Sequence, residues 1–505
     1  MLLIGTLSVA AVGLGSLMLR LVYIRWKYRH IPSPKTRSFI LGHLYEISKE
    51  KAKSRGDHPI DSLMMKWHSE VGSIFVLYTF VDAIVILLNP ADIQTVFMNP
   101  VLQKSHKQTT TFSTVLGERF IGNGVLCMYN NAQWRQTRQL YDHAFQQDFV
   151  RGLFPKLCEC ANEFLAKLMP LADGNTKVPM KKHIYVAAMS IITKVLYSLD
   201  FESVWKGRSL GMKHKYKKDT DINSLWNYAY VGGAIGANNP LYKYLHPFET
   251  RSYCEVARTL RMIGQECVEQ RIKNMQAGKE LPNDLLTCVL KLASNAQAAD
   301  LESLVDNFIN LHGGGGEPSA SALSFAVVLV SQHPDVLQQL LTEIDQVVGK
   351  KKEITFDDLS KLQYTEQVIH ETLRMYGPAT PFGKEAPAGG ITLSGYNISA
   401  GTILSAVHVG IMCQMSQYFE DPYTFKPSRF NPNNQKPSPY VFYPFGIGER
   451  MCAGKFFAMV LMKLFLVRLV QTYEVTLPDE YKLEVEHKLL KRTADDIMCT
   501  IQQRK

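Results

Sequence analysis

A ten-residue segment at 445–454, FGIGERMCAG, constrains this chain more than any other part of its sequence. Gly446 and Gly448 allow backbone turns that other residues avoid, and an apolar, helix-periodic stretch over 453–473 follows. The pattern therefore predicts a loop that brings one cysteine, Cys452, to the start of a helix. Backbone N–H groups and the positive end of the helix dipole favour a thiolate at such a position.

A thiolate in this setting suits an iron porphyrin, with the sulfur as axial ligand and the nearby Arg450 facing a propionate. The alternative for any cysteine is a small, inert, buried side chain, which we expect for most of the other eight. The spacing favours the ligand, because the pattern F-x-x-G-x-R-x-C-x-G fixes five residue types. At this composition it would arise by chance on the order of once in ten thousand chains of this length.

Composition and charge exclude several other classes of protein. The 505 residues are 46% hydrophobic and 20% charged, which excludes a disordered, collagen-like or coiled-coil chain. The nine cysteines include no CxxC pair, so we expect a reducing compartment and neither a zinc ribbon nor a secreted disulfide framework. The net charge of +10 comes without a nucleic-acid-binding motif, and the lysine run at 213–218 is interpreted as a solvated loop. No nucleic-acid partner is expected.

The N-terminus predicts a membrane anchor. Residues 2–19 carry no charge, and 2–24 are interrupted by Arg20 alone, so they can cross a hydrocarbon core of about 30 Å. Arg25 and Lys27 follow, which is the reverse of a cleaved signal peptide and holds the C-terminal side in the cytoplasm. We therefore expect three parts, namely an uncleaved anchor over 1–24, a basic, proline-rich linker over 25–35 and one cytosolic catalytic domain over 36–505.

The domain is expected to be mainly α with small β-sheets, an α+β fold. Two regions rich in β-branched and aromatic residues predict strands, near 73–88 and 391–407. Apolar residues at helical spacing predict helices over 146–170, 250–276, 300–333, 335–348, 357–376 and 453–473.

The predicted helix over 300–333 has an unfavourable centre. Four consecutive glycines at 313–316 and Pro318 should together cost several kcal/mol in helix propensity. Either one helix keeps them because something must approach its backbone closely, or two helices are joined there by a glycine loop. Periodicity alone does not separate these two interpretations.

On these residues the chain resembles the cytochrome P-450 superfamily. The segment at 445–454 matches its haem-binding loop, and Glu371, Arg374 and Arg429 match its buried structural cluster. The resemblance implies haem b as the cofactor, with Cys452 as the ligand of the iron. Lys384 stands where many relatives have an arginine that binds a haem propionate. A lysine cannot make the two parallel hydrogen bonds that an arginine makes to a carboxylate. The other haem contacts implied are Phe445, Arg450, Trp134, Arg138 and Lys384.

Within that superfamily the chain resembles the cholesterol 24-hydroxylase group, on segments at 31–43, 115–125, 356–364 and 418–425. This implies a monooxygenase of the endoplasmic reticulum membrane, single-pass and with its catalytic domain in the cytosol, that hydroxylates a sterol. Dioxygen and NADPH-derived electrons would be used, and the partners would be NADPH–cytochrome P-450 reductase and membrane lipid. We expect Arg135 and Lys455 at the reductase face, and Phe112, Val115, Leu116 and residues 232–243 in the pocket lining.

The chain departs from the family pattern in its long helix. Relatives carry Ala/Gly-Gly-x-Asp/Glu-Thr, whose acid and threonine organise protons for bound dioxygen, whereas this chain has Glu317 followed by Pro318. Ser319 lies one residue on, roughly 100° round the helix. We expect Glu317, Pro318 and Ser319 to form the altered catalytic relay. Two alternatives remain, namely a dioxygen-independent lipid peroxide isomerase or dehydratase and a non-catalytic haem or sterol binder.

Overall fold

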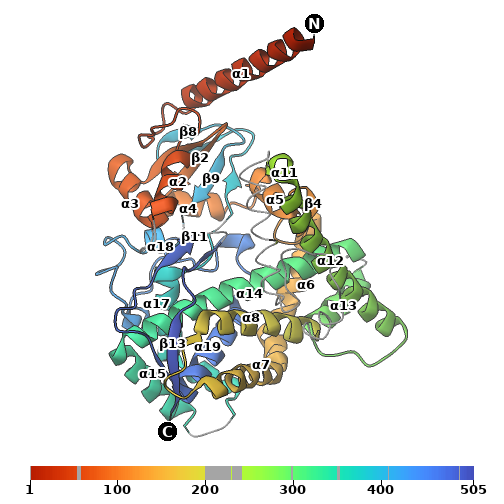
Figure 1. Cartoon of the computed structure of the whole chain (residues 1–505), viewed down its shortest axis with the longest axis vertical. Coiled ribbons are helices and arrows are strands. Elements are labelled where there is room, and N and C mark those ends of the chain that lie inside the picture. The colour runs from red at the N-terminus through yellow and green to blue at the C-terminus, as the bar shows by residue number, and fades with distance from the viewer. Residues whose placement is uncertain are drawn as a thin grey trace. The chain divides into compact units, whose positions relative to one another are not determined.

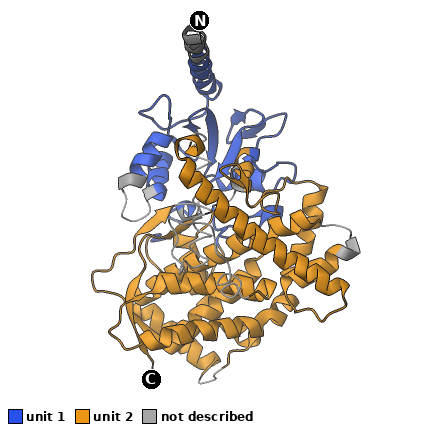
Figure 2. Cartoon of the chain, turned by 45° about the vertical axis from the view of Figure 1, so that its right-hand side comes forward, with its two compact units in different colours: residues 1–106, 380–422, 437–451 blue, residues 107–379, 423–436, 452–505 orange. Residues whose placement is uncertain are grey.

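The computed structural model describes residues 2–53, 59–199, 229, 242–296, 300–349, 353–380, 382–407, 409–487 and 490–504. The chain forms two compact units, shown in blue and orange in Figure 2. The first unit contains residues 1–106, 380–422 and 437–451. The second contains residues 107–379, 423–436 and 452–505. As predicted, the described chain is mostly helical with small sheets.

The first unit is built on a four-stranded sheet in the order β1-β2-β9-β6. β1 (Ile74–Thr79) and β2 (Asp82–Leu87) form an antiparallel hairpin in which Ile74 pairs with Leu87. β9 (Ile403–Ala406) runs parallel to β2, and β6 (Lys384–Glu385) pairs antiparallel with β9. The strands predicted near 73–88 and 391–407 are therefore confirmed. The other elements of this unit are α2 (Leu44–Lys53), α3 (Pro59–Val71), α4 (Pro90–Phe97), the hairpin of β7 (Ile391–Leu393) and β8 (Tyr396–Ile398), α18 (Val409–Met412) and the 3-10 turn η3 (Gly448–Arg450).

The N-terminal segment is helical over α1 (Leu2–Lys27). Among the described residues, no single helix is both long enough and apolar enough to span a membrane. Within the part of the chain that the structure describes, one bent pair of helices, α14 (Leu301–Gln332) and α15 (Pro334–Val347), which meet at 108°, reaches that length and hydropathy when taken together. The membrane-crossing role of residues 1–24 and the boundaries at 25–35 and 36–505 remain predictions.

The second unit is a helical assembly around α14, which passes alongside α8 (Met180–Tyr197) in Figure 1. α12 (Pro247–Gln276), α17 (Gln363–Tyr376) and α19 (Lys455–Thr472) also pack on α14. Two small sheets, in the orders β10-β13-β5 and β11-β12, are formed largely by the C-terminal residues. The remaining elements are α5 (His106–Ser113), β3 (Thr114–Val115), β4 (Glu118–Arg119), α6 (Ala132–Ala144), α7 (Gln147–Leu168), η1 (Met169–Leu171), β5 (Val178–Pro179), α11 (Tyr242–Leu245), α13 (Leu285–Ala296), α16 (Phe356–Lys361), η2 (Pro427–Phe430), β10 (Tyr473–Thr476), β11 (Val485–His487), β12 (Lys491–Thr493) and β13 (Met498–Gln503).

The four glycines lie inside one continuous helix, because α14 runs through them without a break. A Cβ at Gly315 would lie 2.9 Å from the side chain of Ile192, and one at Gly316 would lie 2.2 Å from the sulfur of Met189. Ile192 and Met189 both belong to α8. The interpretation of one helix whose backbone is closely approached is therefore confirmed, and the neighbour that approaches is α8.

The helix predicted over 357–376 is wrong in one respect, since the structure breaks it at Leu362 into α16 and α17. The cause is tertiary: the carboxylate of Glu343 on α15 accepts the backbone N–H groups of Tyr364 and Thr365 at 2.5 and 2.8 Å, which caps a new helix.

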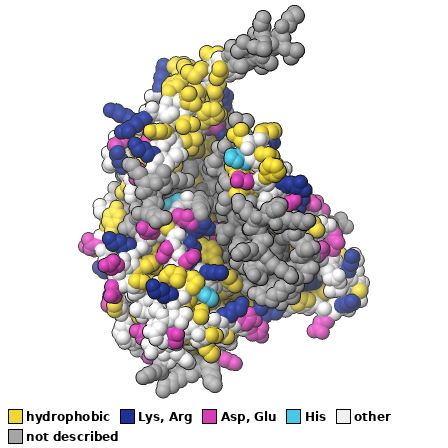
Figure 3. Space-filling model, viewed as in Figure 1, with side chains coloured by type: hydrophobic (Ala, Val, Ile, Leu, Met, Phe, Trp, Pro, Cys, Tyr) yellow, Lys and Arg dark blue, Asp and Glu magenta, His cyan; other side chains and the backbone are white. Residues whose placement is uncertain are grey.

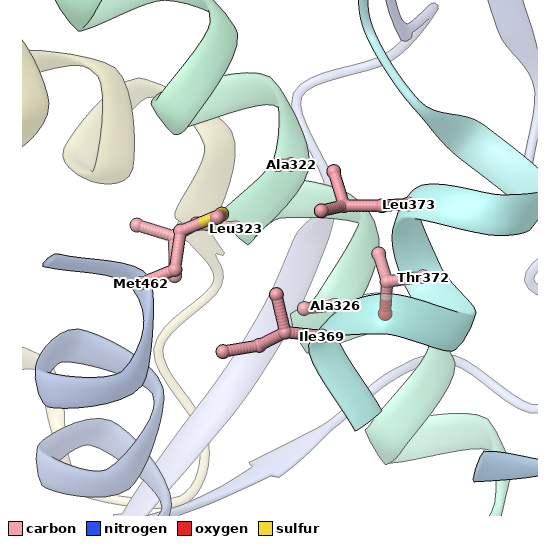
Figure 4. Close-up of a pocket in the computed structure, with 7 residues that line it drawn as sticks. All are labelled: Ala322, Leu323, Ala326, Ile369, Thr372, Leu373 and Met462. Atoms are coloured by element: carbon pink, nitrogen blue, oxygen red, sulfur yellow. The ribbon is translucent and has the colours of Figure 1, made fainter. Parts of the chain in front are cut away.

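The core of the second unit is closely packed where α14, α17 and α19 meet. Figure 4 shows the narrow apolar gap that remains there. The gap is too small for a water molecule and offers no ligand site. Its lining is Ala322, Leu323, Ala326, Ile369, Thr372, Leu373 and Met462.

Candidate functional site

Cys452 lies three residues before α19, on the segment predicted to present it. The structure describes all nine cysteines; every one is free, and Cys452 alone is exposed. Desolvation by the surrounding protein raises the pKa of its thiol, while the N–H of Gly454 and the positive charges of Arg138 and Lys455 oppose that rise. The helix start alone therefore does not produce the thiolate. Coordination to a metal ion, which deprotonates a thiol outright, would supply the missing stabilisation.

Two residues predicted to contact haem lie on α6, in the same unit as Cys452. Asn131 caps this helix by accepting the backbone N–H of Trp134 at 2.8 Å. The side chain of Trp134 is buried, and Arg138 follows one turn later on the same face. Arg138 donates to Asp142 at 2.7 Å and contributes positive charge at Cys452. The charge of Arg138 therefore acts on the thiol of Cys452, and the contact of both residues with haem remains a prediction.

The other predicted haem contacts, Phe445, Arg450 and Lys384, lie in the first unit. Gly446 and Gly448 both adopt positive φ, and a Cβ at Gly448 would lie 2.4 Å from the carbonyl oxygen of Phe97, so that position requires glycine. The loop is thus turned by its glycines, as predicted. Phe445 and Arg450 are half-buried within it.

Lys384 is buried on β6. Its ammonium donates to the carbonyl oxygens of Phe97 at 3.3 Å and Asn99 at 2.9 Å. Burial lowers the pKa of Lys384 to about 8, with Glu449 raising it and Arg450 lowering it further. The structure therefore brings Lys384 and Arg450 together as two cations, which suits an anionic group such as a propionate.

The predicted buried cluster around Glu371 is confirmed. Arg374 donates to both carboxylate oxygens of Glu371, at 2.7 and 2.9 Å, and Arg429 donates at 3.2 Å. The backbone N–H of Lys426 adds a fourth hydrogen bond at 2.9 Å. The side chains of Glu371 and Arg374 are fully buried, so this cluster joins α17 to η2 from inside the unit.

Glu317, on α14, is nearly buried and faces a partner that the sequence did not indicate. Arg492 of β12 places Nη1 3.8 Å from Glu317 Oε1, while its Nε lies 2.5 Å from Glu486 of the neighbouring strand β11. The charge of Glu317 also adds to the effect of burial in raising the pKa of Tyr185 on α8. Glu317 therefore lies among polar side chains, with the guanidinium of Arg492 at the distance of a long ion pair. No local pattern marks Arg492, which lies far along the chain in a three-residue strand.

Pro318 and Ser319 lie beside Glu317 in the helix. Pro318 is half-buried and has no N–H, so it cannot donate to the carbonyl of Gly314 one turn earlier. Gly314 itself is exposed, and among the described residues only Asn310 Oδ1, at 3.9 Å, approaches the position of its missing Cβ. Ser319 is buried. An acceptor carbonyl, a carboxylate and a hydroxyl thus follow one another on this part of α14.

The residues expected in the pocket lining are only partly described. Val115 is buried and Leu116 is half-buried with a positive φ, whereas the side chain of Phe112 and residues 232–241 of the predicted 232–243 lie outside the described part of the chain. Tyr242 is half-buried and Lys243 is exposed on α11. Arg135 and Lys455 are exposed, as residues at a partner surface must be.

His312 predicts a measurable sensitivity to acid. It is fully buried on α14 against Phe308, and burial lowers its pKa to about 3. Between pH 6.5 and pH 3 the unfolded chain therefore binds a proton here that the folded chain does not, so stability falls with falling pH. From pH 7.5 to pH 5 the loss should be about 2 kcal/mol, and His312→Phe should remove it. Urea unfolding of both proteins at the two pH values checks this; equal losses would contradict it.

A protein that presents its one exposed cysteine at the start of a core helix, with an arginine and a lysine beside it, has the donor set of a haem-thiolate protein. Comparison with known proteins agrees. The family model described as Cytochrome P450 matches residues 32–500, so the chain belongs to the cytochrome P450 family.

Individual relatives cover most of the chain at low identity. Cytochrome P450 3A13 of Mus musculus is 26% identical over 418 residues, 81% of this chain and 80% of the relative. Cytochrome P450 3A31 of Mesocricetus auratus is 24% identical over 470 residues, which is 90% of this chain and 87% of the relative. Probable cytochrome P450 4d20 of Drosophila melanogaster is 25% identical over 409 residues, which is 76% of this chain and 78% of the relative. The protein is therefore an oxidoreductase of the monooxygenase type, and its cofactor is haem b held through a cysteine thiolate.

Proposed function

We propose that this protein is a membrane-anchored monooxygenase that hydroxylates a sterol, with the cholesterol side chain as its substrate. The exposed Cys452 at the start of α19 carries the haem-thiolate chemistry. The sterol rests on the four segments that resemble the cholesterol 24-hydroxylase group, among them 115–125. Incubation of the purified protein with cholesterol, NADPH and NADPH–cytochrome P-450 reductase, followed by mass spectrometry, tests it. A hydroxylated product that requires NADPH is expected, and its absence would refute the substrate.

Each candidate residue has a role in this proposal. The family resemblance assigns Cys452 to the iron, Arg138, Arg450 and Lys384 to the propionates, and Trp134 and Phe445 to contacts with the haem. Bound haem supplies the activation of dioxygen. Glu317, whose Oε1 lies 3.8 Å from Nη1 of Arg492, moves protons with the help of Ser319 and the carbonyl of Gly314, to which Pro318 cannot donate. A water bonded to that carbonyl would complete the relay.

We place the protein on the endoplasmic reticulum membrane through α1. Apolar side chains gather on the first unit beyond the start of α1, as Figure 3 shows. They include Val22, Tyr23 and Trp26 of α1 and Phe39, Ile40 and Leu41 of the following segment, all of them exposed. Apolar surface of this kind, flanked by Arg25 and Lys27, suits the interface of a bilayer.

Removal of residues 1–24 should weaken microsomal association without abolishing it, because Phe39, Ile40 and Leu41 stay exposed. Carbonate-resistant pelleting of the full-length and shortened proteins measures this. The sequon at Asn397 gives a second readout: Asn397 is exposed, so it would be modified if it faced the lumen. No glycosylation is expected, and a glycosidase-sensitive shift in mass would overturn the cytosolic topology.

Pro318→Thr should raise the product formed per NADPH consumed by roughly twofold or more, because a hydroxyl would restore direct proton delivery. Less peroxide should then leak from the enzyme. Ser319→Ala in the wild-type background should lower the same ratio if serine is the substitute relay. Product, peroxide and NADPH are measured in one assay. A wild-type enzyme as tightly coupled as the Thr variant, and indifferent to Ser319→Ala, would show that protons do not pass through these positions.

The replacement of threonine by Pro318 also favours a second function, the rearrangement of a lipid peroxide without dioxygen or reductase. Such chemistry needs no proton relay to dioxygen. Turnover of a lipid hydroperoxide without NADPH, together with no NADPH-dependent product from cholesterol, would select it. A sterol-induced spectral shift without any product would instead select a non-catalytic binder.

A further inference from the structure

A second ionic cluster, separate from the residues discussed so far, surrounds Asp306 near the N-terminal end of α14. Its carboxylate is buried, with 1% of the side chain exposed, and it accepts four hydrogen bonds. Arg119 donates twice, from Nε to Oδ1 at 3.1 Å and from Nη2 to Oδ2 at 2.5 Å. Arg261 of α12 donates to Oδ1 at 2.7 Å, and the backbone N–H of Asn123 donates to Oδ2 at 2.7 Å. One carboxylate thus joins α14, α12 and the segment 118–125.

The segment 118–125 lies directly on α14 because of its glycines. Gly122 has a φ of +58°, and a Cβ there would lie 2.2 Å from the carboxylate of Asp306. A Cβ at Gly124 would lie 3.1 Å from the carbonyl oxygen of Asp306 and 3.2 Å from the Cβ of Asn310. Val125, at the end of the segment, is also bonded to α14, because its backbone N–H donates to Asn307 Oδ1 at 2.8 Å. The backbone of this segment is therefore held along one face of α14.

The face of α14 that carries Asp306 continues along the helix toward Pro318 of the proposed proton relay. Residues four apart lie close together on a helix, so Asp306, Asn310, Gly314 and Pro318 follow one another along α14. Asp306 and Pro318 are about 18 Å apart along the axis at 1.5 Å per residue. The segment 118–125 covers Asp306 and Asn310 and ends there, and the next residue of the row, Gly314, is exposed.

We propose that Asp306 is a positioning residue that latches the segment 118–125 onto α14, so that this segment forms the end wall of the ligand site and limits the length of ligand accepted. The inference rests on the haem site of the proposed function and not on its sterol. Arg261 strengthens the latch by also donating to the carbonyl oxygen of Phe120 at 2.8 Å. Glu118 at the start of the segment makes a more exposed ion pair with Arg258 of α12, at 2.6 Å, and serves as the control.

Asp306→Asn removes the charge and one acceptor while keeping the volume of the side chain, and Glu118→Gln does the same at the control pair. Both are made in the full-length holoenzyme. Amide hydrogen exchange over 118–125 should accelerate at least tenfold in Asp306→Asn and stay unchanged in Glu118→Gln. The carbon monoxide spectrum should stay that of the wild type in both variants, which shows that the haem site is folded.

Two ligands that bind haem iron in the same way, one short and one long, then distinguish a change in the end wall from a general change in the haem site. Imidazole should bind Asp306→Asn within about twofold of the wild type, because it does not reach the wall. Binding of 1-dodecylimidazole should weaken about tenfold if the latched state falls to about a tenth of the molecules. Arg119→Lys should keep part of the latch and Arg119→Gln should not.

Unchanged exchange over 118–125, or equal effects on the two azoles, would overturn the proposal. The outcome is independent of the substrate. If cholesterol yields no product but the azoles separate as expected, the sterol assignment fails and the latch stands. If cholesterol is hydroxylated but the azoles and the exchange rates do not respond, the latch fails and the proposed function stands.

Discussion

Cys452→Ser is expected to abolish the red-shifted Soret band of the ferrous–carbon monoxide complex completely. The band requires an anionic sulfur on the iron, and a serine hydroxyl does not supply one at neutral pH. Among the nine cysteines, which are all described, Cys452 alone is exposed, and it lies near the charges of Arg138 and Lys455. Absorbance of the reduced protein before and after carbon monoxide measures the effect.

The matched controls are Cys158→Ser and Cys267→Ser. Desolvation raises the pKa of all three thiols, to about 11 for Cys158 and Cys267, so the controls differ from Cys452 in their position: they lie inside α7 and α12 rather than before the start of α19. Both variants should keep the full band. If the Cys452→Ser protein kept the red-shifted band, the iron ligand would have to be another residue.

Glu371→Gln should destabilise the protein by about 3–5 kcal/mol, because it leaves two buried guanidinium groups without their carboxylate. Arg374 donates to Glu371 from a fully buried position and Arg429 from a largely buried one, and the backbone N–H of Lys426 is left with an uncharged, weaker acceptor. The unfolding midpoint in urea and the haem content per polypeptide both report the loss. We expect little folded holoenzyme at 37 °C.

The control is Asp357→Asn, which removes the partner of Arg151 in an ion pair where both side chains are about half exposed or more. Exposed pairs of this kind contribute about 1 kcal/mol or less. A Glu371→Gln protein no less stable than Asp357→Asn would show that the buried cluster does not hold α17 to η2.

The sequence predicts the part of the site that is encoded locally. The turns at Gly446 and Gly448 and the position of Cys452 before α19 depend on residues within a few positions. The cluster of Glu371 with Arg429 was also predictable, although only through the resemblance to a known family.

What could not be predicted depends on contacts between distant segments. Helical periodicity runs on through Leu362, and nothing near it announces that Glu343 on α15 caps a new helix there. Arg492 reaches Glu317 from a strand of only three residues, and the three residues that donate to Asp306 come from two stretches of chain, 118–125 and α12. Such partners are set by tertiary packing, which single-sequence patterns do not contain.

The close approach of α8 to Gly315 and Gly316 has a consequence for the order of folding. By propensity alone, the turn that contains four glycines and a proline would not hold together, whereas the segments on either side of it are ordinary helix. We therefore expect the turn between the two halves of α14 to become helical last, when α8 packs Ile192 and Met189 against the glycines. The last turn of α14 to form is then the one that ends at Glu317 and Pro318, so the proposed proton relay is assembled only in a chain whose core is already complete.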